Sequence, residues 1–459
     1  MNKLTNKLLI AATHSGAGKT TITLGIMRAL FQRGWVIQPY KVGPDYIDTG
    51  WHRLAANRPS RNLDAFMLAE DVIYSLFTHA AASADINIIE GVMGLYDGFG
   101  LQADYCSSAG IAKQLNCPVI LVVDGKGVST SLAATVQGFS QFIPDIHIAA
   151  VIINRVNSDS HYQILKKAIE YYCQIPVIGR LPVMPELALP SRHLGLIPSQ
   201  ENEADQMQQY WQCLANTIEQ YIDLDKLLEL TYRKIQPTSP IDLSQYTDLS
   251  GVTIAIAKDE AFHFYYQDNL DLLVQLGATL IEFSPLNDTE LPDCQAIYIG
   301  GGFPEMFAER LAQNEQMRIS ISNAHCNAMP IYAECGGLMY LGETLIDLAG
   351  NVHPMVGILS GYSKMSKGLK RFGYAQAEAK VDTLIARKGQ CLRGHEFHHS
   401  EFFTELPACF DMSKQRDGEI VATWQGGYQV GKTFAGYLHL HFYQTPDIIN
   451  CWLGQCKHG

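Results

Sequence analysis

Short apolar runs alternate with segments of helical periodicity over the first 181 residues of the chain. Each run has the length of a strand, several end on an acidic or amide residue, and the segment 19–32 between the first two has the pattern of a helix. Near-continuous apolar strands separated by helices are typical of a parallel sheet with both faces covered. The predicted strands are Leu8–Thr13, Val36–Tyr40, Ile86–Glu90, Val119–Asp124, Ile148–Asn154 and Val177–Leu181.

This pattern breaks between residues 236 and 250, where prolines and small polar residues follow no period. Such a composition is typical of a linker. A new apolar strand begins at Val252, and a helical segment and a further strand at Ala278–Phe283 follow it. We therefore predict one domain over residues 1–235, a linker over 236–250 and a second α/β domain over 251–459.

Composition narrows the function classes. The 459 residues carry a net charge of -12, which argues against a nucleic-acid partner or an anionic membrane surface. The 11 cysteines include no CxxC pair, so a reducing compartment is favoured over a disulfide framework. No apolar run reaches the ~18 residues of a membrane span, and Leu8–Ala12 is too short for a signal-peptide core. We expect a cytoplasmic enzyme without a membrane partner.

The segment 13–21, Thr-His-Ser-Gly-Ala-Gly-Lys-Thr-Thr, lies between a predicted strand and a predicted helix. Glycines let backbone N–H groups turn inward around phosphate oxygens, a lysine adds a positive charge, and a threonine hydroxyl can bind Mg²⁺. Thr13 stands where the usual pattern has its first glycine. The predicted ATP-binding residues are Ser15, Gly16, Ala17, Gly18, Lys19, Thr20 and Thr21, with Asn154 at a strand end as a reader of the adenine edge.

Charged residues at other strand ends complete this prediction. Asp48 and Glu90 are the expected Mg²⁺ ligands together with Thr20. Asp45, Asp97 and Lys41 are expected around the transferred phosphoryl group and its acceptor. The structural alternatives stay open: a carboxylate at a strand end is often a helix cap, a lysine is often a surface residue, and an asparagine is often a plain cap.

A second site centres on Cys335, which lies between the apolar segment 330–334 and Gly336-Gly337. A cysteine on a tight strand-to-helix turn is placed for nucleophilic attack, and the helix N-terminus can hold an oxyanion. His439 and His441 offer a base, with a metal pair as the alternative. Consecutive N–H groups suit an oxyanion hole, and the candidates are Gly301, Gly302 and Gly336.

The segment Gly394–Ser400 holds three histidines, His395, His398 and His399. It lacks the HExxH spacing of a metal-binding helix, and histidines in exposed loops are common. A place in the substrate pocket and a purely structural role both remain open for this cluster.

These motifs together resemble the cobyrinate a,c-diamide synthase family of cobalamin-pathway glutamine amidotransferases over nearly the whole chain. The resemblance implies an N-terminal P-loop parallel-sheet domain similar to dethiobiotin synthetases and a C-terminal class I glutamine amidotransferase α/β domain. The segments that carry it are 13–21, 41–48, 61–64, 90–98, 191–196, 300–305, 333–341 and 394–400.

The resemblance also implies residue roles and substrates. Cys335 would be the glutaminase nucleophile and His439 its base, whereas His441 stands where such domains often carry a glutamate. ATP and Mg²⁺ would activate the a and c carboxylates of a corrinoid, and glutamine would supply ammonia along a sheltered path between the domains. Lys41, Arg53, Arg61 and Arg192 are candidate contacts for this polycarboxylate. A homodimer is compatible with this scheme.

Three alternatives from other classes remain. A partner-binding ATPase switch of the membrane-positioning type has a similar phosphate loop, but such switches carry a lysine where His14 stands and an amphipathic C-terminal helix, whose charge pattern 451–459 lacks. A glutaminase or cysteine peptidase with a regulatory nucleotide domain would turn over ATP without a carboxylate acceptor. A sister ligase would act on hydrogenobyrinate, which is metal-free, or on nickel-sirohydrochlorin.

Overall fold

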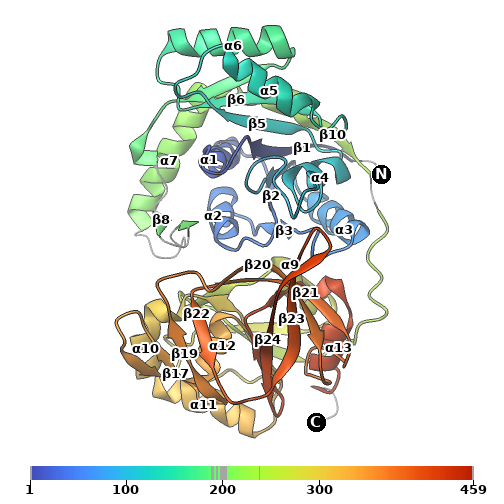
Figure 1. The fold of residues 1–459 in the computed structure, drawn as a ribbon, viewed down its shortest axis with the longest axis vertical. Helices are drawn as coiled ribbons and strands as arrows, with labels where there is room; N and C mark the ends of the chain where they lie inside the picture. Colours follow the sequence, from blue (N-terminus) through green and yellow to red (C-terminus); the bar gives the residue numbers. More distant parts are fainter. Residues whose placement is uncertain (1–2, 188–190, 193–194, 197–203, 237, 457–459) are drawn as a thin grey trace. The chain divides into compact units, whose positions relative to one another are not determined.

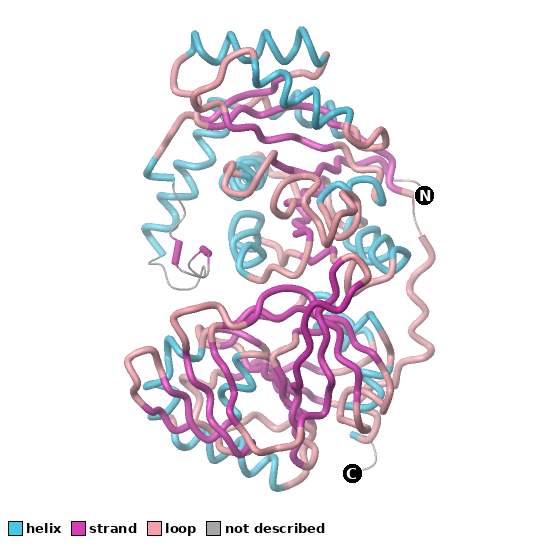
Figure 2. The backbone as a smooth tube through the Cα atoms, viewed as in Figure 1, coloured by secondary structure: helices cyan, strands magenta, loops and turns pink. Residues whose placement is uncertain are grey.

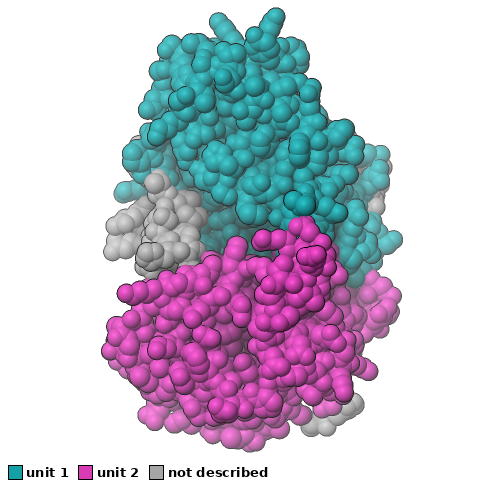
Figure 3. Space-filling model, in the orientation of Figure 1, with its two compact units in different colours: residues 1–65, 69–241 teal, residues 66–68, 242–459 magenta. Residues whose placement is uncertain are grey.

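The computed structural model describes residues 3–187, 191–192, 195–196, 204–236 and 238–456. The chain divides into two compact units (Figure 3). Unit 1 holds residues 1–65 and 69–241, and unit 2 holds residues 66–68 and 242–459.

Unit 1 is built on a sheet in the order β3-β2-β4-β1-β5-β6-β7, and every pairing along this path is parallel. The predicted parallel sheet is therefore confirmed, and β10 adds an antiparallel edge to β1. The strands are β1 Lys3–Ala12, β2 Ile37–Val42, β3 Arg61–Leu63, β4 Ile86–Glu90, β5 Val119–Asp124, β6 Ile148–Asn154, β7 Val177–Leu181 and β10 Tyr232–Ile235.

Strand β1 starts before the apolar run that predicted it. Its polar residues Asn6 and Lys7 are buried because each finds a hydrogen-bond acceptor: the Asn6 amide donates to the Leu228 carbonyl oxygen (2.5 Å) and the Lys7 amine to that of Leu115 (2.7 Å). Hydropathy alone misses such residues, because a buried polar group is stable once it is paired.

Helices cover both faces of this sheet. Alternate residues of β1 point to opposite faces, and Leu8, Ile10 and Ala12 join the core formed with α1, α2, α7 and α8. Helices α5 and α6 lie on the other side of β5 and β6 from α1 and α7 (Figure 1). The helices are α1 Lys19–Gln32, α2 Ile47–Ala56, α3 Glu70–Ala81, α4 Ser108–Gln114, α5 Ser131–Gln141, α6 Asp159–Cys173, α7 Ala204–Tyr221 and α8 Leu224–Thr231.

Unit 2 contains a sheet in the order β13-β11-β14-β16-β25-β24-β23-β20-β21-β26, which is parallel as far as β25 and antiparallel beyond it. More of the backbone of this unit lies in strands than in helices (Figure 2). Its strands are β11 Thr253–Ala257, β13 Thr279–Phe283, β14 Ala296–Ile299, β16 Ile331–Glu334, β20 Arg371–Ala379, β21 Cys391–His398, β23 Ala408–Arg416, β24 Glu419–Val430, β25 Thr433–Gly436 and β26 His439–Leu440.

Smaller elements complete unit 2. A short antiparallel pair joins β12 Phe262–Phe264 to β15 Gly301–Gly302, and a small sheet holds β17 Gly342–Ile346, β18 Val352–Pro354, β19 Leu359–Met365 and β22 Ser400–Phe403. The helices are α9 Gln267–Gln275, α10 Ala308–Gln313, α11 Glu315–Cys326, α12 Gly336–Leu341 and α13 Asp447–Leu453.

In the described part of the chain, no helix combines the length and the apolar character that crossing a membrane requires.

Candidate active sites

The phosphate loop of unit 1 joins β1 to α1. Gly16 and Gly18 have φ angles of 77° and 97°, which glycine adopts at low cost. A side chain at Gly18 would overlap the Asn154 amide, which donates to the Ala17 carbonyl oxygen at 2.8 Å. Arg155 donates to the Gly16 carbonyl oxygen at 2.5 Å. The last residue of β6 and the residue after it thus hydrogen-bond to the phosphate loop, which leads into the N-terminus of α1, where a phosphate can bind.

Lys19 opens α1, and its ammonium group donates to the carbonyl oxygen of Met93. Burial, followed by the charge of Lys41, lowers the pKa of Lys19. Asp97 accepts a hydrogen bond from the Gly94 N–H at 2.8 Å, and therefore shapes the turn that faces Lys19.

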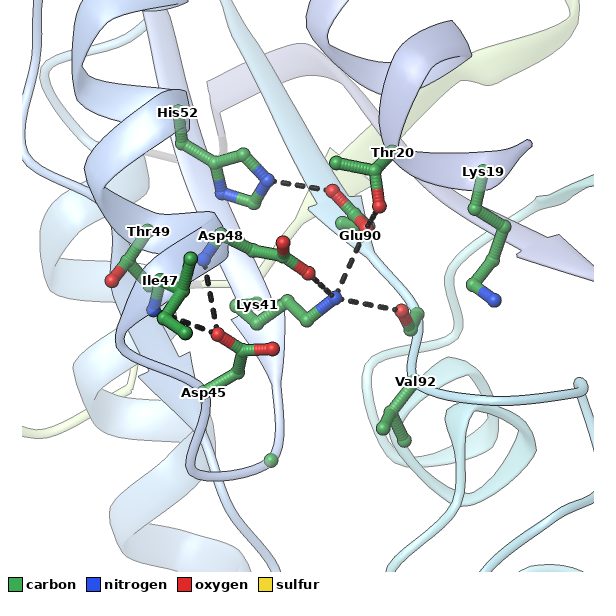
Figure 4. A network of polar contacts seen from close by, with 12 residues as sticks. Lys19, Thr20, Lys41, Asp45, Ile47, Asp48, Thr49, His52, Glu90 and Val92 are labelled. Atoms are coloured by element: carbon green, nitrogen blue, oxygen red, sulfur yellow. Dashed lines mark hydrogen bonds and ion pairs between the residues drawn. The ribbon is translucent and has the colours of Figure 1, made fainter. Parts of the chain in front are cut away.

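Lys41, at the end of β2, lies between two predicted metal ligands (Figure 4). Its ammonium nitrogen is 2.5 Å from Asp48 Oδ2 and 3.0 Å from Glu90 Oε1. Thr20 Oγ1 donates to the same Glu90 oxygen at 2.6 Å. Lys41 and Glu90 are both buried, which excludes the alternative that they are solvent-exposed surface residues. The structure brings Thr20, Lys41, Asp48 and Glu90 into one cluster.

His52 also belongs to this cluster, and sequence reasoning missed it. Its Nε2 lies 2.7 Å from Glu90 Oε2 and its Nδ1 lies 2.9 Å from Ser60 Oγ. It follows Asp48 by four residues on α2, so a search for polar residues on one helix face would have found it.

The charges of this cluster are strongly coupled. Burial alone would raise the pKa of Glu90, but Lys41 and the hydrogen bond from His52 hold that pKa well below its usual range. Burial, with Asp45 adding to it, raises the pKa of Asp48 to about 8. Burial would lower the pKa of Lys41, but the surrounding carboxylates raise it above its ordinary value. The cluster therefore holds more carboxylates than its one lysine neutralises.

Carboxylate and hydroxyl oxygens are the ligands that Mg²⁺ prefers, and Thr20, Asp48 and Glu90 present them within this cluster. No group of three or more His, Cys, Asp or Glu side chains in the described residues is arranged to hold a metal ion by itself. The residues present fit an ion that completes its coordination with phosphate and water oxygens, as Mg²⁺ does.

The other predicted residues of unit 1 are placed as follows. Asp45 accepts hydrogen bonds from the backbone N–H groups of Ile47 (2.8 Å) and Asp48 (3.0 Å), and so caps the start of α2. Arg53 is exposed near the end of α2, and Arg61 opens β3. Arg192 lies in β8 Ser191–Arg192, and its side chain lies outside what the structure describes.

Cys335 of unit 2 lies on a strained turn between β16 and α12. Its backbone has φ 48° and ψ -99°, a conformation that residues with a side chain rarely adopt. Its N–H donates to the Gly436 carbonyl oxygen at 2.7 Å. Such strain is typical of a nucleophile held at a sharp strand-to-helix turn.

His439, on β26, interacts with the side chain of Cys335. Its other neighbour is Glu334, the residue before the cysteine, whose Oε2 lies 3.3 Å from His439 Nδ1. Burial would lower the pKa of His439, but the hydrogen bonds to Cys335 and Glu334 raise it to about 10. The pair thus favours a protonated imidazole beside the sulfur. Sequence reasoning missed Glu334 because 105 residues separate it from His439.

The predicted oxyanion glycines lie around this pair. A Cβ on Gly301 would come within 2.5 Å of His439 Cε1, so only glycine fits there without displacing the imidazole. A Cβ on Gly336 would lie 3.1 Å from the Gly302 backbone nitrogen, so these two glycines are neighbours.

His395, His398 and His441 are buried, whereas His399 is half-buried and lies between β21 and β22. His395 and His398 belong to β21 and not to a loop, because this strand pairs with both β20 and β26. Burial lowers the pKa of His441 to about 3, and burial together with the charge of His439 lowers that of His395 to about 3. Both are neutral imidazoles at pH 7, and of these three histidines it is His439 whose ring interacts with the Cys335 side chain.

Both halves of the chain match known families. Residues 8–197 match the CobQ/CobB/MinD/ParA nucleotide binding domain, and residues 253–446 match the CobB/CobQ-like glutamine amidotransferase domain. The cobyrinate a,c-diamide synthase of Salmonella typhimurium is 52% identical over 98% of both chains. That of Listeria innocua is 53% identical over 98% of this chain and all of its own.

The chain belongs to the cobyrinate a,c-diamide synthase family. A more distant member, from Caldanaerobacter subterraneus, is 44% identical over 98% of both chains. As in this family, the nucleotide-binding half comes first and the glutamine amidotransferase half second, so the chain is a glutamine-dependent amidating ligase. The resemblance inferred from the motifs is confirmed, and the partner-binding ATPase switch is not supported.

Proposed function

We propose that this chain converts the a and c carboxylates of cobyrinate to amides, using ATP for activation and glutamine as the nitrogen donor. The observation that carries the proposal is that one chain holds two complete sets of groups. One set is the phosphate loop with the buried cluster of Lys41 and Glu90, and the other is Cys335 on its strained turn beside His439.

Unit 1 activates the carboxylate in this scheme. The N–H groups of residues 15–21 and the Lys19 ammonium hold the phosphates of ATP. A carboxylate oxygen of the substrate attacks the γ-phosphorus, which gives an acyl phosphate and ADP. Lys41 stabilises charge on the transferring group, and Thr20, Asp48 and Glu90 would hold a Mg²⁺ ion that would supply further neutralisation. Ammonia then displaces phosphate from the acyl carbon, loses a proton and leaves the amide.

Unit 2 releases the ammonia. The Cys335 thiolate attacks the side-chain carbonyl carbon of glutamine, and the N–H groups of Gly301, Gly302 and Gly336 would stabilise the resulting oxyanion. His439 gives its proton to the leaving ammonia, and a thioester forms. His439 then takes a proton from water, whose oxygen displaces the sulfur and releases glutamate.

The names of the relatives support the substrates, and the cysteines support the compartment. The relatives that cover nearly the full length are named cobyrinate a,c-diamide synthases. Lys41, Arg53, Arg61 and Arg192 are our candidates for contacts with the other carboxylates of the corrinoid. All eleven cysteines are free thiols, which fits the reducing cytoplasm.

The test separates the two nitrogen donors. Cys335→Ser should abolish amidation with glutamine and leave amidation with ammonium salts close to the wild-type rate, because the serine hydroxyl is a much weaker nucleophile. Product formation is followed by mass spectrometry of cobyrinate with ATP and Mg²⁺. Loss of activity with both donors, in a variant that unfolds like the wild type, would contradict the two-site scheme. Parallel incubations with hydrogenobyrinate and nickel-sirohydrochlorin test the sister-ligase alternatives.

A further inference from the structure

The carboxylate of Glu334 is almost completely enclosed by protein, with 1% of the residue exposed. Glu334 is the last residue of β16, immediately before the turn that carries Cys335. A buried carboxylate is costly unless hydrogen bonds and charges compensate it, so its surroundings indicate what holds it there.

Four groups surround the two oxygens of Glu334. Oε1 accepts hydrogen bonds from the Tyr332 hydroxyl (2.5 Å) and the Leu440 N–H (3.1 Å). Oε2 accepts one from the Tyr298 hydroxyl (3.2 Å) and lies 3.3 Å from His439 Nδ1. Hydrogen bonds from the two tyrosine hydroxyls and the backbone thus compensate the burial of the Glu334 carboxylate beside the imidazole.

This arrangement fixes the orientation of His439. Nδ1 donates its proton to Glu334, so Nε2 is the nitrogen left for the Cys335 sulfur and for glutamine. The ring also lies close to Gly301, because a Cβ at that position would come within 2.5 Å of its Cε1 and 3.3 Å of its Nε2. The Cys-His pair is therefore backed by a carboxylate in the geometry of a catalytic triad.

Position 441, two residues after the base, carries no carboxylate. His441 is buried, and burial lowers its pKa to about 3, so it provides no negative charge there. The carboxylate of Glu334 instead contacts His439 Nδ1.

We propose that Glu334 is the third member of the glutaminase triad, a positioning residue that orients His439 and stabilises its protonated form. This inference deepens the proposed function and rests on it. When the Cys335 proton moves to Nε2, the positive charge on the ring faces the Glu334 carboxylate. The same carboxylate then holds the ring while Nε2 protonates the leaving ammonia, and Glu334 itself keeps its charge throughout.

The test is Glu334→Gln, which keeps the size and shape of the side chain but removes its charge. We expect kcat with glutamine to fall by about 10²–10⁴-fold, the range that loss of an orienting carboxylate produces in other triads, with KM for glutamine changed only a few fold. Amidation with ammonium salts should stay at the wild-type rate. Glu343→Gln, which alters an exposed glutamate of the same unit, is the matched control.

The pH profile separates positioning from a structural role. The pH at which His439 loses its proton, read from site-resolved alkylation of Cys335, should fall by about one unit or more in Glu334→Gln, the effect of a lost neighbouring charge. Glu334→Asp, which keeps the charge, should retain the wild-type pH dependence at a lower kcat. Tyr332→Phe leaves the carboxylate in place and serves if Glu334→Gln does not fold; it should lower kcat with glutamine several fold while sparing the ammonia reaction.

The outcomes distinguish this inference from the proposed function. Glutamine-dependent activity of Glu334→Gln within threefold of the wild type, together with an unchanged alkylation profile, would overturn the triad while leaving the two-site scheme intact. Survival of glutamine-dependent activity in Cys335→Ser would instead overturn the proposed function itself.

Discussion

Gly301 packs directly against the ring of His439 in the glutaminase site, and this contact yields a quantitative prediction. A Cβ at position 301 would lie 2.5 Å from His439 Cε1, whereas ordinary contacts begin at 3.4 Å. Gly301→Ala therefore has to move the ring by about 0.9 Å (3.4 − 2.5 = 0.9). The ring cannot retreat freely, because His439 is 2% exposed and hydrogen-bonded to Glu334.

A displacement of about 1 Å in a catalytic group costs roughly 10²-fold in rate. We therefore expect kcat/KM for glutamine to fall about 100-fold in Gly301→Ala, which corresponds to about 2.7 kcal/mol of transition-state stabilisation. The assay compares glutamine with ammonium salts as the nitrogen donor and follows amide formation. The ammonia reaction should be unchanged, since it bypasses His439.

Gly368→Ala is the matched control, because a Cβ there meets nothing within 4 Å. It should behave as the wild type with both donors. Glutamine-dependent kcat/KM of Gly301→Ala within threefold of the wild type would refute the reasoning, because it would show that the imidazole has no fixed position to lose.

Two further predictions concern unit 1. His52→Asn removes the hydrogen bond to Glu90 Oε2, so the free energy of unfolding in urea should fall by about 1–3 kcal/mol and amidation should fall equally with either donor; a decrease with glutamine alone would contradict the assignment of His52 to the activation site. Because burial raises the pKa of Asp48 to about 8, calorimetric affinity for a Mg²⁺-bound ATP analogue should increase from pH 7 to pH 9 as Asp48 loses its proton. The same titration of Asp48→Asn should be much flatter, and an identical pH dependence would remove Asp48 from the metal site.

Local patterns predicted the elements that position the two sites. β4, β5, β6 and β7 have the predicted bounds because a strand buried on both faces of a parallel sheet is apolar along its whole length. The phosphate loop and the Cys335 turn were found for a similar reason, since each consists of consecutive residues between a strand and a helix.

The partners of these motifs could not be predicted in the same way. Glu334 meets His439 across 105 residues of sequence, and His52 meets Glu90 across 38. Each contact depends on how strands and helices pack, and no local period encodes it. The three-residue strand β3 was missed because it is too short to show alternation. The buried histidines of β21 resembled a loop because their strand carries glycine and polar residues.

The central claim is that ATP-driven activation and glutamine hydrolysis in this one chain yield a diamide. It is tested most directly by mass spectrometry of cobyrinate incubated with the wild-type chain, ATP, Mg²⁺ and glutamine labelled with ¹⁵N in its side-chain amide. The account predicts a product with two new amides, both carrying ¹⁵N, and no such product when ATP is omitted. Unchanged cobyrinate, or amidation that proceeds without ATP, would contradict it.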